Sequence, residues 1–318
     1  MKITVISFDF WNYDVHIVEE LRKQGIEAHH INLGAYQHKN LAVRAKNAFS
    51  KFFLGKNLKT GKRNELILET LKKNGLQDQI LVINPELIDA KHHSVIKKYT
   101  KKYIAYLYDS LARCPAEHLL DFFDEIFSFD KKDAEEHGFK RITNYNYLYD
   151  YQTDIKAKYD LVYLASFDSR MNKAIAIAEK VKSFGRKPQF FVTGKKSWKK
   201  KLNNPYRDFM TFRRKRIQHK EIPELYSKSK AVLDLVRENQ DGLSFRVFEA
   251  MALRRKLITN NKTIAEYDFY HPQNILLVDN DFKNLDSAFF DSGYHELTPE
   301  TYEKYTLRNW VKTVFGLA

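Results

Sequence analysis

The segment from Ala231 to Leu253 carries residue types that suit phosphate binding. It reads as a buried strand over 231–235, a polar turn over 239–242 and a helix that Ser244 can cap. Backbone N–H groups at such a helix start, after the flexible Gly242, suit an anionic phosphate. Arg246, in the first turn of the helix, adds a fixed positive fork. The pattern therefore predicts an anion site at this turn.

Glu249 is the acidic residue of this otherwise apolar helix, five positions after Ser244. A carboxylate there can accept two hydrogen bonds from the adjacent hydroxyls of a ribose. The alternative is a surface ion pair with Arg246, three residues earlier on the same helix. The spacing alone leaves both interpretations open.

The elements that must position these residues alternate between strand and helix. In the first half we expect a helix capped by Asn12 or Asp14 and closed by Gly25. Further helices are expected at 86–98, 116–123 and 131–137, and strands at 3–7, 26–32, 79–83, 103–108 and 125–129. Strands separated by helices predict parallel crossovers and hence a doubly wound sheet.

A second series of the same kind follows an aperiodic aromatic stretch at 143–158. Its strands are expected at 161–165, 189–192, 209–212, 232–235, 256–259 and 274–278, and its helices at 172–184, 224–228 and 244–253. Thr298 and Pro299 start a last helix that packs back on the body. We therefore predict an α/β chain with Rossmann-like domains at 1–150 and 151–296, and a terminal helical segment at 297–318.

The sequence of residues 241–261 resembles that of the nucleotide-sugar glycosyltransferases with the GT-B architecture. Such enzymes often carry an acidic residue, seven intervening residues and a Glu, which here are Asp241 and Glu249. GLSFRVFEAMAL resembles a bacterial branch that glycosylates lipopolysaccharide, capsule or spore-coat material, as do YLYDSLARCP, EIFSFDKKDAEEHGF and YLASFDSR. The resemblance spans most of the chain and implies two facing Rossmann-like domains with a cleft between them.

The chain departs from that pattern at two places. Asp241 stands where Glu is common, and Arg254 and Arg255 replace the glycine usual after the helix. These departures leave open whether transfer retains or inverts the sugar's configuration.

The resemblance also implies roles for individual residues on the donor side. Glu249 would hold the donor ribose, while the sugar or diphosphate would meet the turn and helix start at Asp241, Gly242, Leu243, Ser244 and Arg246. Arg170 and Lys195, each after a strand of the second domain, would stabilise the leaving diphosphate without a metal. Their alternative is a solvated surface charge. No cofactor is expected beyond a nucleotide-sugar donor, for which family frequency favours UDP.

A general base for the acceptor hydroxyl is expected from the first domain. Asp109 follows a predicted strand and would point into the cleft, and Asp9, after the first strand, is its rival. A carboxylate within hydrogen-bond distance can take the proton during attack. Each could equally cap a helix or turn, and a retaining enzyme needs no such base.

The net charge of +14 predicts partners that carry phosphate. Residues 39–63 mix Lys and Arg with Phe49, Phe52 and Phe53, which suits an element resting on an anionic membrane. The alternative is a helix whose phenylalanines enter the core. One cysteine and the lack of a signal-peptide core favour the cytoplasm, with peripheral attachment to the inner face of the membrane.

Two functions compete with a glycosyltransferase acting on a cell-surface glycan or lipid-linked acceptor. The charge and the many aromatic residues would also suit a nucleic-acid-binding protein, but no helix-turn-helix, zinc module or RNA-binding signature accompanies them, and nucleic acid is not expected as a partner. A catalytically inactive member that binds sugar nucleotides is the other alternative, against which Arg246 and Glu249 count. The sequence contains neither a G-x-G-x-x-G dinucleotide fingerprint nor a P-loop.

Overall fold

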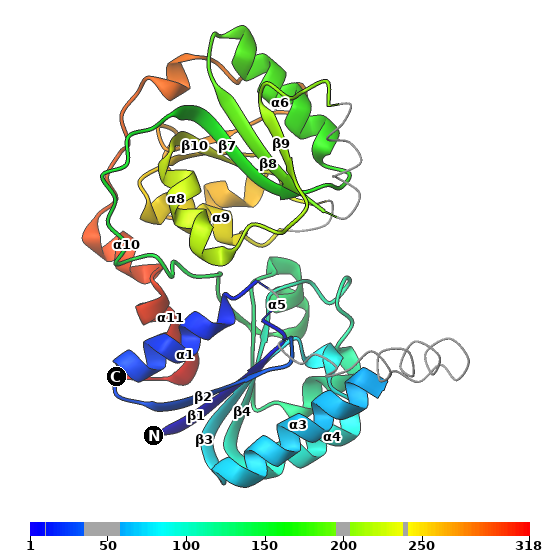
Figure 1. The fold of residues 1–318 in the computed structure, drawn as a ribbon. Coiled ribbons are helices and arrows are strands. Elements are labelled where there is room, and N and C mark those ends of the chain that lie inside the picture. The colour runs from blue at the N-terminus through cyan, green and yellow to red at the C-terminus, as the bar shows by residue number, and fades with distance from the viewer. Residues whose placement is uncertain (10, 35–57, 195–203, 238–240) are drawn as a thin grey trace. The chain divides into compact units, whose positions relative to one another are not determined.

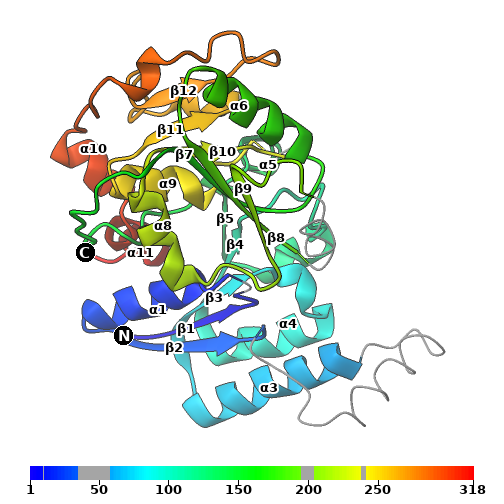
Figure 2. The same cartoon turned by 45° about the horizontal axis from the view of Figure 1, so that its top comes forward.

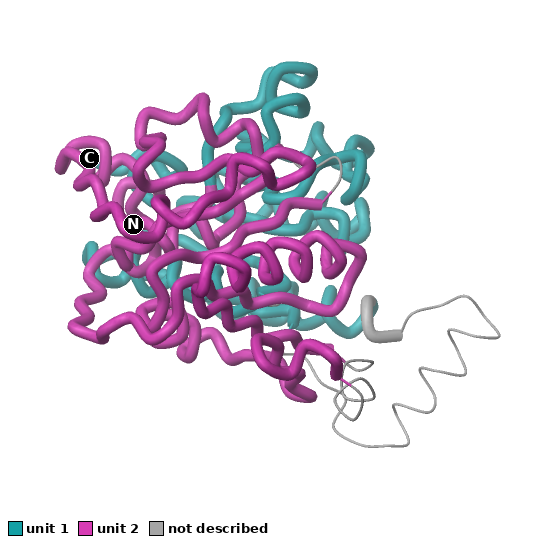
Figure 3. The backbone as a smooth tube through the Cα atoms, turned by 90° about the horizontal axis from the view of Figure 1, so that it is seen from above, with its two compact units in different colours: residues 1–143, 311–318 teal, residues 144–310 magenta. Residues whose placement is uncertain are grey.

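The computed structural model describes the chain except for residues 10, 35–57, 195–203 and 238–240 (Figure 1). Its contacts divide the chain into a first unit of residues 1–143 and 311–318 and a second unit of residues 144–310 (Figure 3). The division lies at 143/144 rather than at 150 because Asn144 and Asn146 bond to the second unit. The Asn144 amide donates to the Leu243 carbonyl at 2.9 Å, and the Asn146 backbone N–H donates to the Tyr305 carbonyl at 2.8 Å.

The segment expected at 297–318 does not form one terminal body. Residues 297–310 belong to the second unit and 311–318 to the first. The single expected helix is two helices, α10 (Pro299–Lys304) and α11 (Leu307–Phe315). Thr298 caps α10 by accepting from the Thr301 N–H, as the sequence predicts.

The first unit contains one sheet of six parallel strands in the order β2-β1-β3-β4-β5-β6. The strands are β1 (Lys2–Ser7), β2 (Glu27–Asn32), β3 (Gln77–Ile83), β4 (Thr100–Leu107), β5 (Glu125–Ser128) and β6 (Lys140–Arg141). The chain leaves β1 toward β2 and then returns to β3 on its other side. This reversal creates a topological switch point between β1 and β3, where ligands of such sheets bind.

In the described part of the first unit, the helices are α1 (Asp14–Lys23), α3 (Leu58–Asn74), α4 (Ala90–Ile96), α5 (Lys131–His137) and the end of α11. Ile17, Val18 and Leu21 of α1 are all buried, as their helical spacing predicts. Gly25 follows α1 with φ 77°, the left-handed conformation that ends a helix. From α11, the Phe315 carbonyl accepts a hydrogen bond of 2.8 Å from the Gln79 side chain on β3.

The second unit contains another six-stranded parallel sheet, in the order β12-β11-β10-β7-β8-β9 (Figure 2). Its strands are β7 (Tyr159–Ser166), β8 (Pro188–Thr193), β9 (Met210–Arg213), β10 (Ser229–Asp234), β11 (Lys256–Thr259) and β12 (Ile275–Leu277). Besides α10 and the start of α11, the described helices of the second unit are α6 (Met171–Ser183), α8 (Ile222–Ser227) and α9 (Phe245–Ala252). This is the Rossmann order, and the expected fold class of two doubly wound α/β domains is confirmed.

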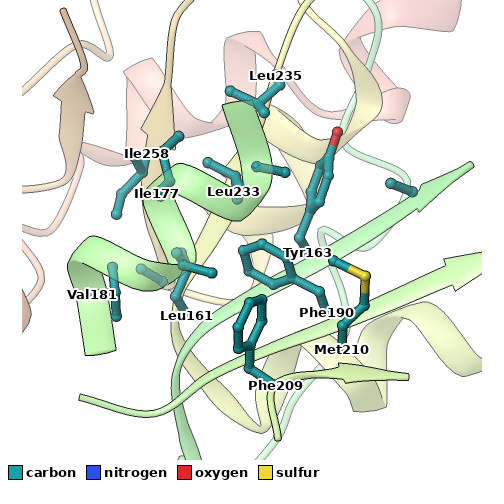
Figure 4. Packing of buried hydrophobic residues seen from close by; sticks show 14 of the residues in the cluster. Leu161, Tyr163, Ile177, Val181, Phe190, Phe209, Met210, Leu233, Leu235 and Ile258 are labelled. Carbon is teal, nitrogen blue, oxygen red and sulfur yellow. The ribbon is translucent and has the colours of Figure 1, made fainter. Parts of the chain in front are cut away.

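Successive residues of a strand point to opposite faces of its sheet, and both faces of the second sheet are buried. On β7, Leu161 and Tyr163 pack with Ile177 and Val181 of α6 on one face (Figure 4). Their neighbours Val162 and Leu164 join the cluster of α9 on the other face. The Tyr163 ring meets the Phe190 ring edge to face, at 5.5 Å between centroids and 71° between planes. Unbroken apolar strands are the sequence signature of such a sheet.

Helix lengths differ from expectation more than strand positions do. The helix expected at 86–98 is interrupted, with α4 between two 3₁₀ turns at Pro85–Leu87 and Lys97–Tyr99. The helix expected at 116–123 is a 3₁₀ segment, Glu117–Phe122. Helix α3 was not expected, because it begins inside the basic segment 39–63.

Most of the basic segment 39–63, including Phe49, Phe52 and Phe53, lies outside the described residues. Its last residue, Arg63, is 8% exposed, and its guanidinium lies 4.5 Å from the centre of the Phe8 ring. Arg63 therefore packs against the first unit and is not part of an exposed basic surface. Among the described helices, none is long and apolar enough to span a bilayer.

Candidate functional site

The centre of the second sheet brings two predicted loops together. Strands β7 and β10 are hydrogen-bonded neighbours, with Val232 opposite Val162. The chain runs from β7 through α6 to β8 on one side, and from β10 through α9 to β11 on the other. The loops that follow β7 and β10 therefore diverge, and their side chains meet at the switch point of this sheet.

Arg170, after β7, is held rigidly at this point. Its Nε donates to Asp168 at 3.0 Å and its Nη2 to the second Asp168 oxygen at 2.5 Å. Its Nη1 reaches across to the Leu235 carbonyl after β10, at 2.7 Å. Burial would raise the pKa of Asp168, but the hydrogen bonds and charge of Arg170 hold it below its ordinary value. The carboxylate thus stays ionised and fixes the direction of the guanidinium.

Two further guanidinium groups lie at the same end of the sheet. Arg237, after β10, is 3.7 Å from the Asp168 carboxylate, and its side chain is 44% exposed. Arg246, on the first turn of α9, donates to the Leu164 carbonyl at 3.1 Å and pairs with Asp234 at 3.3 Å. We call Arg170, Arg237 and Arg246 the arginine cluster. Three guanidinium groups at one end of the sheet suit an anion.

Ser244 lies at the N-cap position of α9 but does not cap the helix with its side chain. Its hydroxyl donates instead to the Asp234 carboxylate at the end of β10, at 2.8 Å. Asp234 has no exposed surface, so its charge must be satisfied internally. Competition from this buried acceptor is the physical reason that the predicted side-chain cap is wrong.

The turn before α9 is fixed through its carbonyl groups. The Asp241 carbonyl accepts from Thr263 at 2.7 Å and from Asn261 at 3.2 Å, and the Gly242 carbonyl from Asn261 at 3.4 Å. The carbonyl of the buried Leu243 accepts from Asn144. The Asp241 side chain is exposed. Asn261 and Thr263, which follow β11, are positioning residues that the sequence pattern did not single out.

Glu249 is 1% exposed, and its carboxylate accepts a hydrogen bond of 2.8 Å from the Tyr147 hydroxyl. It is therefore not the surface ion pair that the spacing had left open. Tyr147 belongs to the aromatic stretch before β7, 102 residues away in the chain. Because α9 also carries Arg246, the buried carboxylate and the arginine cluster lie on one short helix.

Guanidinium groups suit a diphosphate, and a carboxylate suits a diol. A nucleotide sugar contains both of these polar groups. Of the predicted donor residues, Ser244 and Arg246 both bind Asp234, and Arg170 binds Asp168 and the Leu235 carbonyl at the same end of the sheet. Glu249 lies one turn along α9 from Arg246. Lys195 lies outside the described residues. Asp168, Asp234 and Arg237 were missed, although Asp168 and Arg237 follow predicted strands and Asp234 is the acidic residue inside one. In the described parts of the chain, no three His, Cys, Asp or Glu side chains group in a way that could hold a metal.

In the first unit, the two predicted base candidates both lie after strands of the sheet. Asp9 is 6% exposed with φ 23°, and its two oxygens accept from the backbone N–H groups of Asp14 and Val15 at 3.0 and 3.1 Å. Asp9 is thus the acidic cap of α1, a role expected of Asn12 or Asp14. Asp109 accepts from the Ser110 N–H and pairs with Arg113 at 2.9 Å.

A buried acid that the sequence did not indicate lies beside Asp9. Asp14 is 2% exposed, and burial together with the charge of Asp9 raises its pKa from 3.8 to about 8, against a smaller lowering by Ser7. Its Oδ2 atom has no hydrogen-bond partner among the described residues. The Ser7 hydroxyl is 2.9 Å from the His30 ring, whose pKa burial lowers despite the attraction of Asp9. Asp14 therefore carries a proton in the folded protein at neutral pH.

We expect Asp14→Asn to stabilise the protein by an amount that grows from pH 5 to pH 8. In this interval the folded chain holds a proton on Asp14 that the unfolded chain has released, so wild-type stability falls as pH rises. The slope is at most about 1.4 kcal/mol per pH unit. Thermal unfolding midpoints of both proteins across this range measure the difference. A difference that is constant with pH would contradict the assignment.

Comparisons with known proteins give this geometry a context. Residues 172–304 match the sequence model of a family described as glycosyl transferase-like. No curated protein matches the chain by sequence. Among solved structures, AviGT4, a glycosyltransferase of avilamycin A biosynthesis, is 10% identical with a TM-score of 0.63, covering 99% of this chain and 96% of its own.

Two other solved structures match over the whole length of both chains. The lipopolysaccharide outer core galactosyltransferase WaaB is 11% identical with a TM-score of 0.55, covering 100% of each chain. The UDP-GlcNAc 2-epimerase of Methanocaldococcus jannaschii, in complex with UDP-GlcNAc and UDP, is 13% identical with a TM-score of 0.57, again covering 100% of each. At these identities the likeness shows the fold. The resemblance to GT-B glycosyltransferases is thus confirmed: the chain has the GT-B fold, and its residues 172–304 match a family described as glycosyl transferase-like.

Proposed function

We propose that this protein transfers a sugar from a nucleoside-diphosphate donor to a hydroxyl group of a cell-surface glycan or lipid-linked acceptor, without a divalent metal. The observation that carries the proposal is the arginine cluster at the switch point of the second sheet, one helical turn from the buried Glu249. The glycosyl transferase-like match over residues 172–304 covers most of the elements that supply these residues.

The arginine cluster suits the diphosphate of such a donor. Sugar transfer expels a nucleoside diphosphate, and its growing negative charge must be stabilised as the bond breaks. Arg170 is already oriented by Asp168 and Leu235, so it needs little reorganisation to meet that charge. The Arg237 side chain is 44% exposed, compared with 13% for Arg170, so Arg237 is better placed to turn toward a bound anion. Lys195 stays a candidate on the sequence alone.

Glu249 suits the ribose. A carboxylate is the acceptor that suits the two adjacent hydroxyls of a ribose, and the bond from Tyr147 holds the Glu249 carboxylate in place. Burial on α9 excludes competing water and strengthens such bonds. We take UDP as the first nucleotide to test, because the epimerase of similar fold binds UDP-GlcNAc and UDP.

The same neighbour defines the main competing activity. UDP-GlcNAc 2-epimerases share the fold, so binding of a UDP-sugar alone does not separate transfer from epimerisation. Product analysis separates them: transfer releases UDP and extends an acceptor glycan. Epimerisation changes the sugar without an acceptor. An inactive sugar-nucleotide-binding member would bind UDP and form neither product.

For an inverting reaction, Asp109 is the better placed of the two base candidates. Both oxygens of Asp9 are used to cap α1, so removing that cap would unravel the helix start. The Asp109 side chain is 19% exposed and is paired with Arg113, which is itself 44% exposed. An acceptor hydroxyl that takes the place of Arg113 would donate its proton to the Asp109 carboxylate.

Glu249→Gln is expected to weaken UDP binding at least about tenfold, because hydrogen bonds to a charged group contribute roughly 1.5–3 kcal/mol each. Gln is preferred to Ala because the carboxylate is buried, and truncation would leave a cavity beside Tyr147. The matched control is Tyr147→Phe, which removes the hydrogen bond from the Tyr147 hydroxyl to Glu249 and should change UDP affinity less. Calorimetry measures both. Equal UDP affinity in wild type and Glu249→Gln would show that Glu249 has only a structural role.

Transfer should continue in EDTA at an undiminished rate, because the arginine cluster takes the place of a metal at the diphosphate. The measurement is UDP release from the cognate UDP-sugar with and without EDTA. Loss of activity that magnesium or manganese restores would refute metal independence. Arg170→Lys in the same assay should lose most activity, because Lys cannot reproduce the forked contacts to Asp168.

The acceptor proposal includes attachment to an anionic membrane surface through residues 39–63, on the strength of their composition. Each Lys or Arg near such a surface contributes about 1 kcal/mol. Charge reversal at Lys46, Lys51 and Lys56 should therefore release the protein from vesicles containing phosphatidylglycerol. Transfer to a soluble acceptor analogue should be unchanged. Failure of the wild-type protein to co-sediment with these vesicles at low salt would rule out the attachment.

A further inference from the structure

The second unit contains a cavity of about 300 Å³ at the C-terminal end of α9, away from the switch point. It forms where the segment Tyr149–Thr153, residues 251–254 and the segment Tyr294–Tyr302 meet. The arginine cluster lies at the other end of α9, and a helix of eight residues is about 12 Å long. The cavity is therefore a separate feature from the proposed donor site.

Four tyrosines line this cavity: Tyr149, Tyr151, Tyr294 and Tyr302. The Tyr302 hydroxyl accepts from the Asn146 amide at 3.0 Å and donates to the Tyr149 carbonyl at 3.4 Å, so this ring is held in place. The Arg308 guanidinium covers the Tyr149 ring at 4.7 Å from its centre. Burial raises the pKa of Tyr294, so its hydroxyl stays neutral at physiological pH. The wall is aromatic, with polar groups at the edges of its rings.

The charged groups at this cavity balance one another. Arg254 pairs with Glu296 at 3.1 Å, and their side chains are 71% and 61% exposed. Arg254 has φ 51°, a left-handed conformation that costs a non-glycine residue about 1–2 kcal/mol. It stands where the resembling enzymes have glycine. The chain therefore carries a guanidinium at a backbone position that glycine would occupy with less strain.

We propose that this cavity is a second carbohydrate site, which holds a neutral sugar residue of a glycan. A sugar ring has apolar C–H faces and a rim of hydroxyls, which match aromatic rings with polar edges. The Arg254–Glu296 pair supplies both donors and acceptors for those hydroxyls and no net charge for a phosphate. The volume is at the lower end for ligand pockets, which suits one or two sugar rings rather than a whole nucleotide sugar.

The site would anchor a glycan at a distance from the reacting sugar. It relies on the proposed function only for the source of that glycan, because binding here needs neither donor nor transfer. An enzyme that extends or decorates a polymer gains effective concentration by holding the acceptor at two points.

The test uses the full-length protein and a panel of neutral disaccharides built from glucose, galactose and N-acetylglucosamine. Binding is measured by saturation-transfer NMR and calorimetry, with and without UDP. At least one disaccharide should bind, and Tyr151→Ala should weaken it at least fivefold. Tyr151 is 36% exposed, so its removal should not unfold the protein.

Arg254→Gly separates binding from folding. It relieves the left-handed strain and should therefore maintain or raise the unfolding midpoint while it weakens the disaccharide at least fivefold. UDP affinity should be unchanged in both cavity variants. Glu249→Gln is the matched control and should keep wild-type disaccharide affinity. If the wild type binds disaccharide but not UDP, the second site stands and the proposed donor function fails.

Three results would overturn the second site. The first is no binding by any member of the panel at millimolar concentration. The second is disaccharide affinity that Glu249→Gln lowers and the cavity variants do not, which would place the sugar at the donor site. The third is that only a proline-rich peptide, the other ligand class that aromatic grooves accept, binds to the cavity.

Discussion

The Asp234 carboxylate lies buried at the end of β10, and three side chains from two other elements bind to it. Ser244 donates from the start of α9, Arg246 from its first turn, and Thr259 from the end of β11. A buried charge with no partners would cost several kcal/mol, so these contacts form together with the fold. They set where α9 starts relative to the sheet. The position of Arg246, and with it that of Glu249, depends on this one carboxylate.

A second carboxylate, that of Asp168, positions two members of the arginine cluster. Asp168 holds Arg170 by two of its nitrogens and draws Arg237 from the loop after the neighbouring strand. Arg170 in turn bonds to the Leu235 carbonyl, so the loops after β7 and β10 are joined by one guanidinium. A site that is held by internal charges before any ligand arrives loses little entropy on binding.

The strands were predictable, because runs such as Leu161–Ala165 are apolar throughout and both faces of the second parallel sheet are buried. The helices were less so. Helix α3 was not predicted, because its sequence is rich in lysine and begins in the basic segment 39–63. Residues 117–122 have the composition of a helix but form a 3₁₀ segment. At the site, the sequence indicated Arg170, Arg246 and Glu249. The distant partners Leu235 and Tyr147 could not be predicted, because contacts between residues 65 and 102 positions apart exist only once the sheet is assembled. Asp168, two residues before Arg170, is a local partner that the pattern did not single out.

Because both faces of β7 are buried, the number of residues in this strand matters more for the site than which apolar residues they are. Leu161, Val162, Tyr163 and Leu164 alternate between the two clusters, and all four are apolar. Losing one residue from this strand would exchange the faces and still leave apolar side chains on both. It would, however, draw Asp168 and Arg170 back by about 3.3 Å and turn them over. The length of β7 thus fixes the position of Asp168 and Arg170. Exchange of one apolar side chain for another on β7 leaves that position unchanged, whereas insertion or deletion of a residue does not.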